Sequence, residues 1–487
     1  MTSGYAAPRM HTSKGVILLL SCAAQFMVVL DVAIVNVALP SIQRDLGIGQ
    51  STLQWIVVAY GLMLGGFLLL GGRMADLVGR RRMLLTGLAL FCLASLLAGV
   101  AGSAGLLIGA RALQGFGAAM VAPAALSILA VTFAEGAERN RALGIYGAVT
   151  GISASAGVIA SGLLTAGPGW RWVFFINVPI GAILIAMAAI FLAADARDRR
   201  RSERFDIAGA VTVTAGLLLL VYALSRGTES GWGSGTALGL FAASVVMLCA
   251  FVRIEARSRS PLVPGSAVRN RTLVAANLSA LFTFGAIISF IFLGSLLMQQ
   301  VLGYSPTRTG VCWLATTATS FIAAALTGAR LVAVVGVRRL LVLGFSLLAI
   351  SALLLTRVPA GGHFATDLLP ALLLAGVAGG LSAPAIQIGA LSGVTRSMTG
   401  LASGLVETMR EIAGAIGVAA VSTVLVSRAG AAGPSARVLG TPNAFHAAYW
   451  VIFAVAALGA LTAAIAFPWR ATRKTGPVRY RPATSRP

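Results

Sequence analysis

Five charged side chains lie inside long apolar segments of this 487-residue chain: Asp31, Arg111, Glu407, Arg410 and Glu411. An ionisable group in the middle of a membrane-spanning helix costs at least about 2.5–3.5 kcal/mol on insertion scales, so such groups are rare and are candidates for function. A carboxylate there can take up and release a proton, and an arginine beside it favours the ionised form. The five residues therefore predict chemistry of protons or charged solutes inside a membrane.

Asp31 and Arg111 are expected to meet at one depth in the membrane. At about 1.5 Å per residue, Asp31 lies about 12 Å and Arg111 about 8 Å from the outer ends of their apolar segments. An ion pair would keep Asp31 ionised, and loss of the contact in a second conformation would favour its protonation. The alternative interpretation is an ion pair with a purely structural role.

Glu407, Arg410 and Glu411 have the i, i+3, i+4 spacing that places side chains on one face of a helix. Two carboxylates around one guanidinium cannot both be fully compensated, so one of them is expected to bind a proton or a cationic substrate. The alternative is an arginine that stabilises the C-terminal half, with one glutamate facing a wet gap.

The composition excludes most other kinds of protein. Hydrophobic residues make up 58% of the chain and charged residues 10%, with a mean hydropathy of +0.90, whereas soluble proteins are about 25% charged. The four cysteines and three histidines are scattered, and no Gly-rich loop precedes either lysine, which excludes a Walker A motif. We expect an all-α polytopic membrane protein with no metal, no cofactor and no enzymatic activity.

Fourteen segments are long and apolar enough to cross a membrane. They lie at about 15–39, 52–71, 83–101, 106–133, 142–166, 172–194, 206–225, 235–252, 272–299, 309–329, 339–356, 368–393, 400–427 and 446–468. If the segments alternate in direction, 28 of the 37 Lys and Arg residues fall on the side that carries both termini. Positive charge marks the cytoplasmic side, so both termini are predicted to be cytoplasmic. Membrane topology thus explains the net charge of +23, and no binding of nucleic acid is expected.

An internal repeat divides the chain. Residues 71–87 and 328–344 are identical at eight of seventeen positions, at a constant offset of 257. The pattern favours two parallel repeats, a transporter architecture with its site at the interface between the halves; the alternative is a chance match between Arg- and Gly-rich loops. The predicted parts are a cytoplasmic N-terminus (1–14), a six-helix bundle (15–194), a linker with two extra transmembrane helices (195–271), a second six-helix bundle (272–468) and a basic cytoplasmic tail (469–487).

Several motifs resemble those of the major facilitator superfamily and of its fourteen-span drug:proton antiporter branch. They are GGRMADLVGRRRML (71–84), LDVAIVNVALP (30–40), QWIVVAYGL (54–62), RALQGFGAAMVAP (111–123), WRWVFFINVPIG (170–181) and ASGLVETMREIAGAIG (402–417). The fifth span departs from the branch pattern GPxxGG, because Val158 replaces the proline and Ser161 replaces a glycine. In the thirteenth span, Glu407 and Glu411 stand where the branch usually has amides.

The resemblance implies roles for three further sets of residues. The loop after the second span would form a conformational latch that bridges spans 2 and 11 in the outward-open state, through Gly72, Asp76, Gly79 and Arg80. Glycines of the fifth span would allow close packing and gating, at Gly147, Gly151, Gly157 and Gly162. Side chains that could line a substrate cavity are Met27, Asn36, Gln114, Phe284 and Gln387, although such residues more often belong to the core or face lipid.

The resemblance implies proton-coupled efflux of an amphipathic or cationic small molecule, such as a drug, antibiotic or secondary metabolite, by alternating access. Asp31, Glu407 and Glu411 would couple the cycle to the proton motive force, with Arg111 and Arg410 as charge partners. The protein would act as a monomer in the bacterial cytoplasmic membrane. Two alternatives are a lipid or metabolite transporter of the same fold without proton antiport, and a non-transporting membrane sensor.

Overall fold

A computed structural model describes residues 13–193, 206–258, 261–359, 361–430 and 442–467. Helices form throughout these ranges, and no strand occurs in them. Thirteen helices are long and apolar enough to cross a membrane. The fourteenth long helix of the described chain, α5 (Ala137–Ala166), has 30 residues, which is ample for about 30 Å of hydrocarbon. The all-α fold with fourteen spans is therefore confirmed. Residues 1–12 of the predicted N-terminus (1–14), residues 195–205 of the predicted linker (195–271) and the whole predicted tail (469–487) lie outside the described residues.

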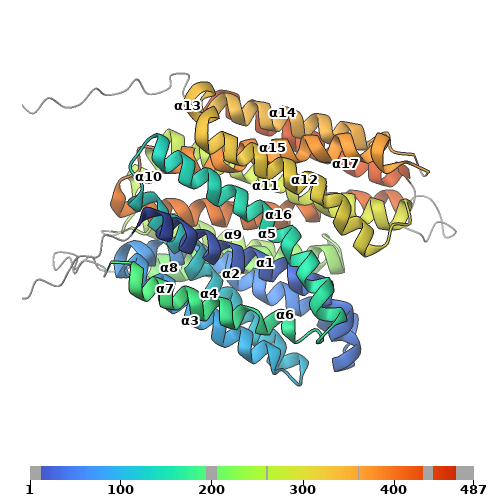
Figure 1. The fold of residues 1–487 in the computed structure, drawn as a ribbon, viewed down its shortest axis with the longest axis horizontal. Helices are drawn as coiled ribbons and strands as arrows, with labels where there is room; N and C mark the ends of the chain where they lie inside the picture. Colours follow the sequence, from blue (N-terminus) through green and yellow to red (C-terminus); the bar gives the residue numbers. More distant parts are fainter. Residues whose placement is uncertain (1–12, 194–205, 259–260, 360, 431–441, 468–487) are drawn as a thin grey trace, which may run out of the picture.

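The N-terminal bundle occupies the lower part of Figure 1. Besides α5 it contains α1 (Lys14–Leu46), α2 (Gln50–Val78), α3 (Arg80–Gly99), α4 (Ala104–Thr132) and a sixth span made of α6 (Trp172–Phe175) and α7 (Asn177–Phe191). The α4 helix is mostly buried, because small residues such as Ala and Gly let neighbouring helices approach closely.

The C-terminal bundle repeats this arrangement in the upper part of Figure 1. Its spans are α11 (Arg271–Leu296) with η1 (Leu297–Val301), α12 (Pro306–Leu326) with η2 (Thr327–Leu331) and α13 (Val332–Val335), α14 (Val337–Leu355), η3 (Phe364–Leu368) with α15 (Leu369–Leu391), α16 (Thr399–Gly430) and α17 (Pro442–Ala466). A 3₁₀ turn, η4 (Arg396–Met398), precedes α16.

The predicted repeat is visible in matching glycines of the two bundles. Gly79 and Gly336, 257 residues apart, both adopt a positive φ (118° and 83°) at the turn into the third span of their bundle, a conformation that favours glycine. A Cβ at Gly87 would press on α4 at Val121, and one at Gly344 would press on α15 at Ala378, again 257 residues apart. The chance-match interpretation is therefore wrong.

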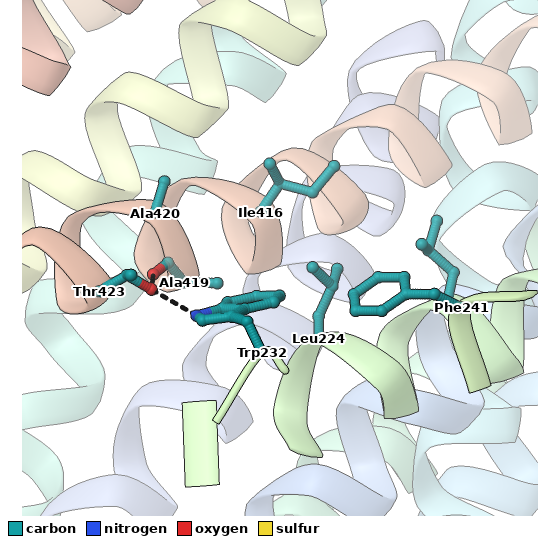
Figure 2. A pocket seen from close by; sticks show the side chains of 8 residues that line it. Leu224, Trp232, Phe241, Ile416, Ala419, Ala420 and Thr423 are labelled. Atoms are coloured by element: carbon teal, nitrogen blue, oxygen red, sulfur yellow. Dashed lines mark hydrogen bonds between the residues drawn. The ribbon is translucent and has the colours of Figure 1, made fainter. Parts of the chain in front are cut away.

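Two inserted helices, α8 (Ile207–Ser230) and α9 (Gly235–Glu255), lie across the seam between the bundles. The α8 helix packs on both α2 and α16, and α9 packs on α8. Figure 2 shows the indole of Trp232 between these helices, where its Nε1 donates to Thr423 Oγ1 of α16 at 2.7 Å. The indole lines an apolar groove of about 480 Å³ between α8, α9 and α16. The short α10 (Gly265–Arg269) leads into the C-terminal bundle.

The transmembrane helices end at two opposite sides of the molecule. We call one side the latch end, because it carries the predicted latch residues: α1 begins there at Lys14 and α2 ends there at Val78. At the opposite end, α1 ends at Leu46. Figure 1 places α10 and α13 at the latch end and α6 at the opposite end.

An ion pair joins α1 to the loop before α6 at the opposite end. Arg171 Nη1 donates to Asp45 Oδ2 at 2.7 Å and Trp170 Nε1 donates to the same oxygen at 3.0 Å. The hydrogen bond from Arg171, followed by that from Trp170, lowers the pKa of Asp45 below its ordinary value of 3.8. The contribution of the pair to stability is therefore complete above the ordinary pKa and is lost as the pH falls through the lower folded-state pKa.

We expect Asp45→Asn to cause only a small drop in Tm at neutral pH, because exposed ion pairs are screened by water. Thermal unfolding of the purified protein at pH 7 and pH 3 measures this, and the difference between variant and parent should shrink at pH 3. A difference that grows on acidification would show that the ion pair does not lower the pKa of Asp45.

Candidate functional site

The predicted ion pair between Asp31 and Arg111 is present and is almost fully enclosed by protein. Arg111 Nη1 donates to Asp31 Oδ2 at 2.5 Å, and the two side chains are 1% and 0% exposed. Both bring a charge into the apolar interior of the N-terminal bundle, where only mutual compensation and further hydrogen bonds make burial tolerable. The prediction that the two residues meet at one depth is confirmed.

Neutral side chains complete this network. Asp31 Oδ1 accepts from Gln114 Nε2 at 2.7 Å and from Asn177 Nδ2 at 2.8 Å. Arg111 also donates to Gln114 Oε1 and to the backbone oxygen of Ile56. The ring of Tyr60 lies 4.2 Å from the guanidinium carbon, which adds a cation–π contact. Every charge of the pair is thus held by several partners from α2, α4 and α7.

Gln114 and Met27 were predicted to line a cavity, and in this structure both side chains are enclosed by protein. Gln114 also donates to Ser95 Oγ, so its amide is used by the network. Met27 is fully buried in the core of the N-terminal bundle, near Cys92 and Gly181. Asn177 and Tyr60 were missed as site residues, although both lie in motifs that the sequence analysis singled out. Nothing in those motifs says that the two side chains turn toward Asp31.

A second charge cluster lies on α16. Arg410 Nη1 is 2.6 Å from Glu407 Oε2, and Arg410 Nη2 is 3.1 Å from Glu411 Oε1. The side chain of Glu407 is 1% exposed and that of Glu411 is 30% exposed. The predicted arc of two carboxylates around one guanidinium is confirmed. With both carboxylates ionised, the cluster has one excess negative charge.

The second cluster faces the N-terminal bundle through Tyr146 and α2. The buried hydroxyl of Tyr146 on α5 is within electrostatic range of Glu407 and Arg410, and it donates to Gln25 Oε1 on α1 at 2.9 Å. A Cβ at Gly65 on α2 would lie 3.9 Å from the Cβ of Glu411. The α16 cluster therefore belongs to the interface between the bundles.

The charged residues at the end of α2 and the start of α3, predicted to form the latch, do contact the C-terminal bundle, but not at the predicted helix. Asp76 Oδ1 and Oδ2 accept the backbone N–H groups of Gly400 and Leu401 at 3.0 and 2.9 Å. These amides begin α16, the thirteenth span, so the predicted bridge to the eleventh span (α14) is wrong. A carboxylate at a helix N-terminus is favourable because the first N–H groups of a helix have no partner inside it.

Arg80 holds the latch from the side. Its Nη2 donates to Asp76 Oδ1 at 3.0 Å and to Thr399 Oγ1 at 3.1 Å, and its Nε donates to Ser127 Oγ of α4 at 2.7 Å. Gly72 lets α2 approach α16, because a Cβ there would lie 2.9 Å from the Cα of Gly404 and still closer to the carbonyl oxygen of Gly400. The two bundles are therefore locked together at the latch end.

The two bundles also touch backbone to backbone where α5 meets η2. A Cβ at Gly144 on α5 would lie 2.6 Å from the Cα of Gly328 on η2. Among the four predicted α5 glycines, Gly157 packs against Ala33 of α1 and Gly147 lies near Pro384 of α15. A Cβ at Gly162 would meet no described atom within 4 Å, so the packing role predicted for it is wrong; no contacts are described for Gly151.

Comparison with known proteins identifies this arrangement. Residues 21–418 match the family description Major Facilitator Superfamily. The chain belongs to this superfamily. It is 39% identical over 460 residues to a puromycin resistance protein of Streptomyces alboniger, covering 91% of this chain and 89% of the relative. It is also 39% identical over 419 residues to a cephamycin export protein of Amycolatopsis lactamdurans, covering 84% of each.

A solved structure shares the fold at low sequence identity. The human organic anion transporter MFSD10 superposes with a TM-score of 0.66 at 14% identity, covering 91% of this chain and 99% of that one. The protein is therefore a multi-pass membrane transporter of the major facilitator superfamily and not an enzyme. No three His, Cys, Asp or Glu side chains come together as a metal site in the part of the chain that the structure describes.

The remaining predicted cavity residues lie on helices of both bundles in the superfamily fold. Gln387 on α15 is 6% exposed, and Phe284 on α11 is partly buried. Asn36 lies in α1, and its side chain is outside the described part.

Proposed function

We propose that the protein exports an amphipathic or cationic small molecule, such as an antibiotic or another drug, from a bacterial cell in exchange for protons. The resistance and export proteins that share 39% identity over most of the chain support export. The surplus of positive charge at the latch end supports a cytoplasmic location for that end and for both termini. The protein would act as a monomer, with no cofactor and the proton motive force as its energy source.

The observation that supports proton coupling is the enclosed network around Asp31. In the conformation with a closed latch, Asp31 is 0% exposed and has Arg111, Gln114 and Asn177 as partners. Asn177 belongs to α7, Arg111 and Gln114 to α4, and Asp31 to α1. When the bundles rock to open the latch end, a small shift among these helices would weaken the compensation of Asp31 and favour its protonation.

Transport in everted membrane vesicles tests this function. Vesicles that contain the protein should accumulate ethidium or puromycin when their interior is acid, and a protonophore should stop accumulation at once. Accumulation that ignores the protonophore would overturn proton coupling and favour a lipid or metabolite carrier, the alternative to which Val158 and Ser161 point. No transport of any probe across a drug panel would favour the sensor alternative.

We expect Glu407→Gln combined with Glu411→Gln to lower the pH-driven transport rate by about tenfold or more. The α16 cluster then has no carboxylate that could bind a proton or pair with a cation. Uptake into everted vesicles at matched protein levels measures the rate. The matched control is Glu135→Gln with Glu138→Gln, which changes two exposed carboxyls near the start of α5. Equal rates for parent and α16 double variant would remove the α16 cluster from the coupling mechanism.

A further inference from the structure

An apolar groove of about 420 Å³ lies between α2 and the inserted helix α8. Six half-buried side chains line it: Trp55, Leu62, Ala215, Leu218, Leu219 and Tyr222. Sites for small molecules have volumes of about 300–1,000 Å³, but they usually add a few polar groups that fix the ligand. This lining is aliphatic and aromatic throughout, so the groove suits a hydrocarbon chain.

Two kinds of contact between α2 and α8 frame the groove. A Cβ at Gly66 on α2 would collide with the side chain of Leu218 on α8, and one at Gly65 would lie 3.7 Å from Val221. The ring centroids of Trp55 and Tyr222 lie 5.6 Å apart, with tilted planes. The helices thus approach closely at the glycines and are spaced by two large rings elsewhere, which leaves the groove between them.

The groove extends from the membrane surface into the hydrocarbon. The apolar stretch of α2 begins at Trp55, and that of α8 ends at Leu224. Trp and Tyr side chains concentrate at the level of the lipid head groups, where the ring meets acyl chains and the polar atom meets water. Trp55 and Tyr222 therefore mark the membrane surface at the opposite end, and the aliphatic part of the groove lies at the depth of acyl chains.

An arginine lies beside the groove at head-group depth. Arg226 is two residues beyond the apolar stretch of α8. Its Nε donates to the hydroxyl of Tyr222 at 3.2 Å, and its guanidinium carbon lies 5.8 Å from the centroid of the Tyr222 ring. The half-buried arginine is thereby held against a residue that lines the groove. A guanidinium presents a planar fork of N–H donors that matches a phosphate.

Membrane topology does not account for Arg226. Positive residues concentrate on the cytoplasmic side, where 28 of the 37 Lys and Arg residues are predicted to lie, but Arg226 belongs to the opposite end. Arg171 at the same end has the carboxylate of Asp45 as its partner. An anion held at the membrane surface would give Arg226 a corresponding role, and the adjoining groove indicates that this anion carries a hydrocarbon chain.

We propose that an anionic phospholipid such as phosphatidylglycerol binds at this place, with its phosphate at Arg226 and one acyl chain in the groove between α2 and α8. Phosphatidylethanolamine has the same phosphate, but its ammonium group cancels the net charge that attracts an arginine. With the latch end in the cytoplasm, as proposed above, the lipid belongs to the outer leaflet. The site requires neither the exported molecule nor protons, so it goes beyond the proposed function.

Quenching of Trp55 by lipids with brominated acyl chains tests the proposal. The purified full-length protein in detergent is titrated with brominated phosphatidylglycerol or with brominated phosphatidylethanolamine of the same chains. Subtracting the signal of Trp55→Phe isolates Trp55 from the other tryptophans. We expect half-maximal quenching at an about fivefold lower concentration of phosphatidylglycerol, the effect of one basic residue on an anionic lipid. Equal half-maximal concentrations, or no quenching of Trp55, would overturn the proposal.

Substitutions of the arginine assign the head-group preference. Arg226→Gln should remove the preference for phosphatidylglycerol, and Arg226→Lys should retain most of it, because the charge remains. The matched control is Arg357→Gln, which changes an exposed arginine that follows α14, and it should leave both titrations unchanged. A preference that survives Arg226→Gln would place the head group elsewhere and overturn the site.

A second pair of variants and a competitor test the acyl chain. Ala215→Leu should weaken quenching by both lipids about threefold or more, because its side chain takes space from acyl-chain methylenes. Val245→Leu on α9, at a position that is 59% exposed, is the control and should have no effect. Glycerol 3-phosphate in large excess should not relieve the quenching, because it has no chain. Relief by glycerol 3-phosphate would show a site for a soluble phosphate and overturn the lipid site.

Discussion

Asp31→Asn is expected to abolish transport driven by a pH gradient while exchange of substrate across the membrane at equal pH continues. Asparagine keeps the shape of Asp31 and can still contact Gln114 and Asn177, but it can neither bind nor release a proton in the cycle. Exchange requires only that the loaded protein change conformation. We expect the pH-driven rate to fall by about a hundredfold and the exchange rate to change by less than about threefold.

Stability must be separated from coupling in this experiment. Removing one partner of an enclosed ion pair costs about 3–5 kcal/mol, because the other charge remains. In Asp31→Asn, however, Arg111 retains the Ile56 carbonyl, the Gln114 amide oxygen and the Tyr60 ring. The variant should therefore fold with a lowered Tm, which a thermal melt in detergent will register.

The double variant Asp31→Asn with Arg111→Gln distinguishes the two interpretations of the ion pair. It removes both charges together, so much of the lost Tm should return. If the pair couples protons, pH-driven transport should stay absent even though stability is restored. If the pair is purely structural, the double variant should transport at the rate of the parent, and Asp31 would then have no part in the mechanism.

Gly72→Ala is expected to keep the latch end open and to stop the transport cycle in folded protein. A methyl group on Gly72 would lie 2.9 Å from the Cα of Gly404 and closer to the Gly400 carbonyl. Backbone cannot yield as a flexible side chain can, so α2 and α16 would be pushed apart. The Asp76 hydrogen bonds to the start of α16 would then be lost, and each bond to a charged group contributes about 1.5–3 kcal/mol.

Distances between spin labels across the two bundles measure this effect. Val78 on α2 and Val334 on α13 are 39% and 81% exposed at the latch end, so both positions accept labelled cysteines in a background without the native ones. The label distance should increase in Gly72→Ala, and pH-driven uptake should fall by about tenfold or more. Gly162→Ala is the matched control, because its Cβ meets no described atom within 4 Å. An unchanged distance in Gly72→Ala would show that the seam tolerates a side chain.

Local spacing and depth were enough to predict parts of the charge clusters. Glu407, Arg410 and Glu411 share one helix, where positions three and four apart are neighbours regardless of the rest of the fold. Asp31 and Arg111 are 80 residues apart, yet their depths were fixed by the ends of two apolar segments. Charges at one depth in hydrocarbon gain most by pairing, and the structure pairs them.

The helix that contacts Asp76 could not be predicted from depth in the membrane alone. Asp76 was assigned to the end of a helix at the correct side of the membrane, but to the eleventh span instead of the thirteenth. Several spans begin at that side, and each offers N–H groups without partners. Which of them faces α2 depends on how the two bundles dock, because only that docking puts the start of α16 beside Asp76.

The sequence by itself determined the membrane location, the fourteen spans, the repeat and the five intramembrane charges. Polar groups are costly in hydrocarbon, so membrane-spanning segments are long and apolar and the few charges within them stand out. Only the tertiary structure decided which neutral residues join the charges. Asn177 and Tyr60 contact the Asp31–Arg111 pair, and Tyr146 of α5 donates to Gln25 of α1. A neutral polar side chain costs little on any helix face, so its position in the sequence does not reveal its partner; the partner is fixed only when helices distant in the chain pack side by side.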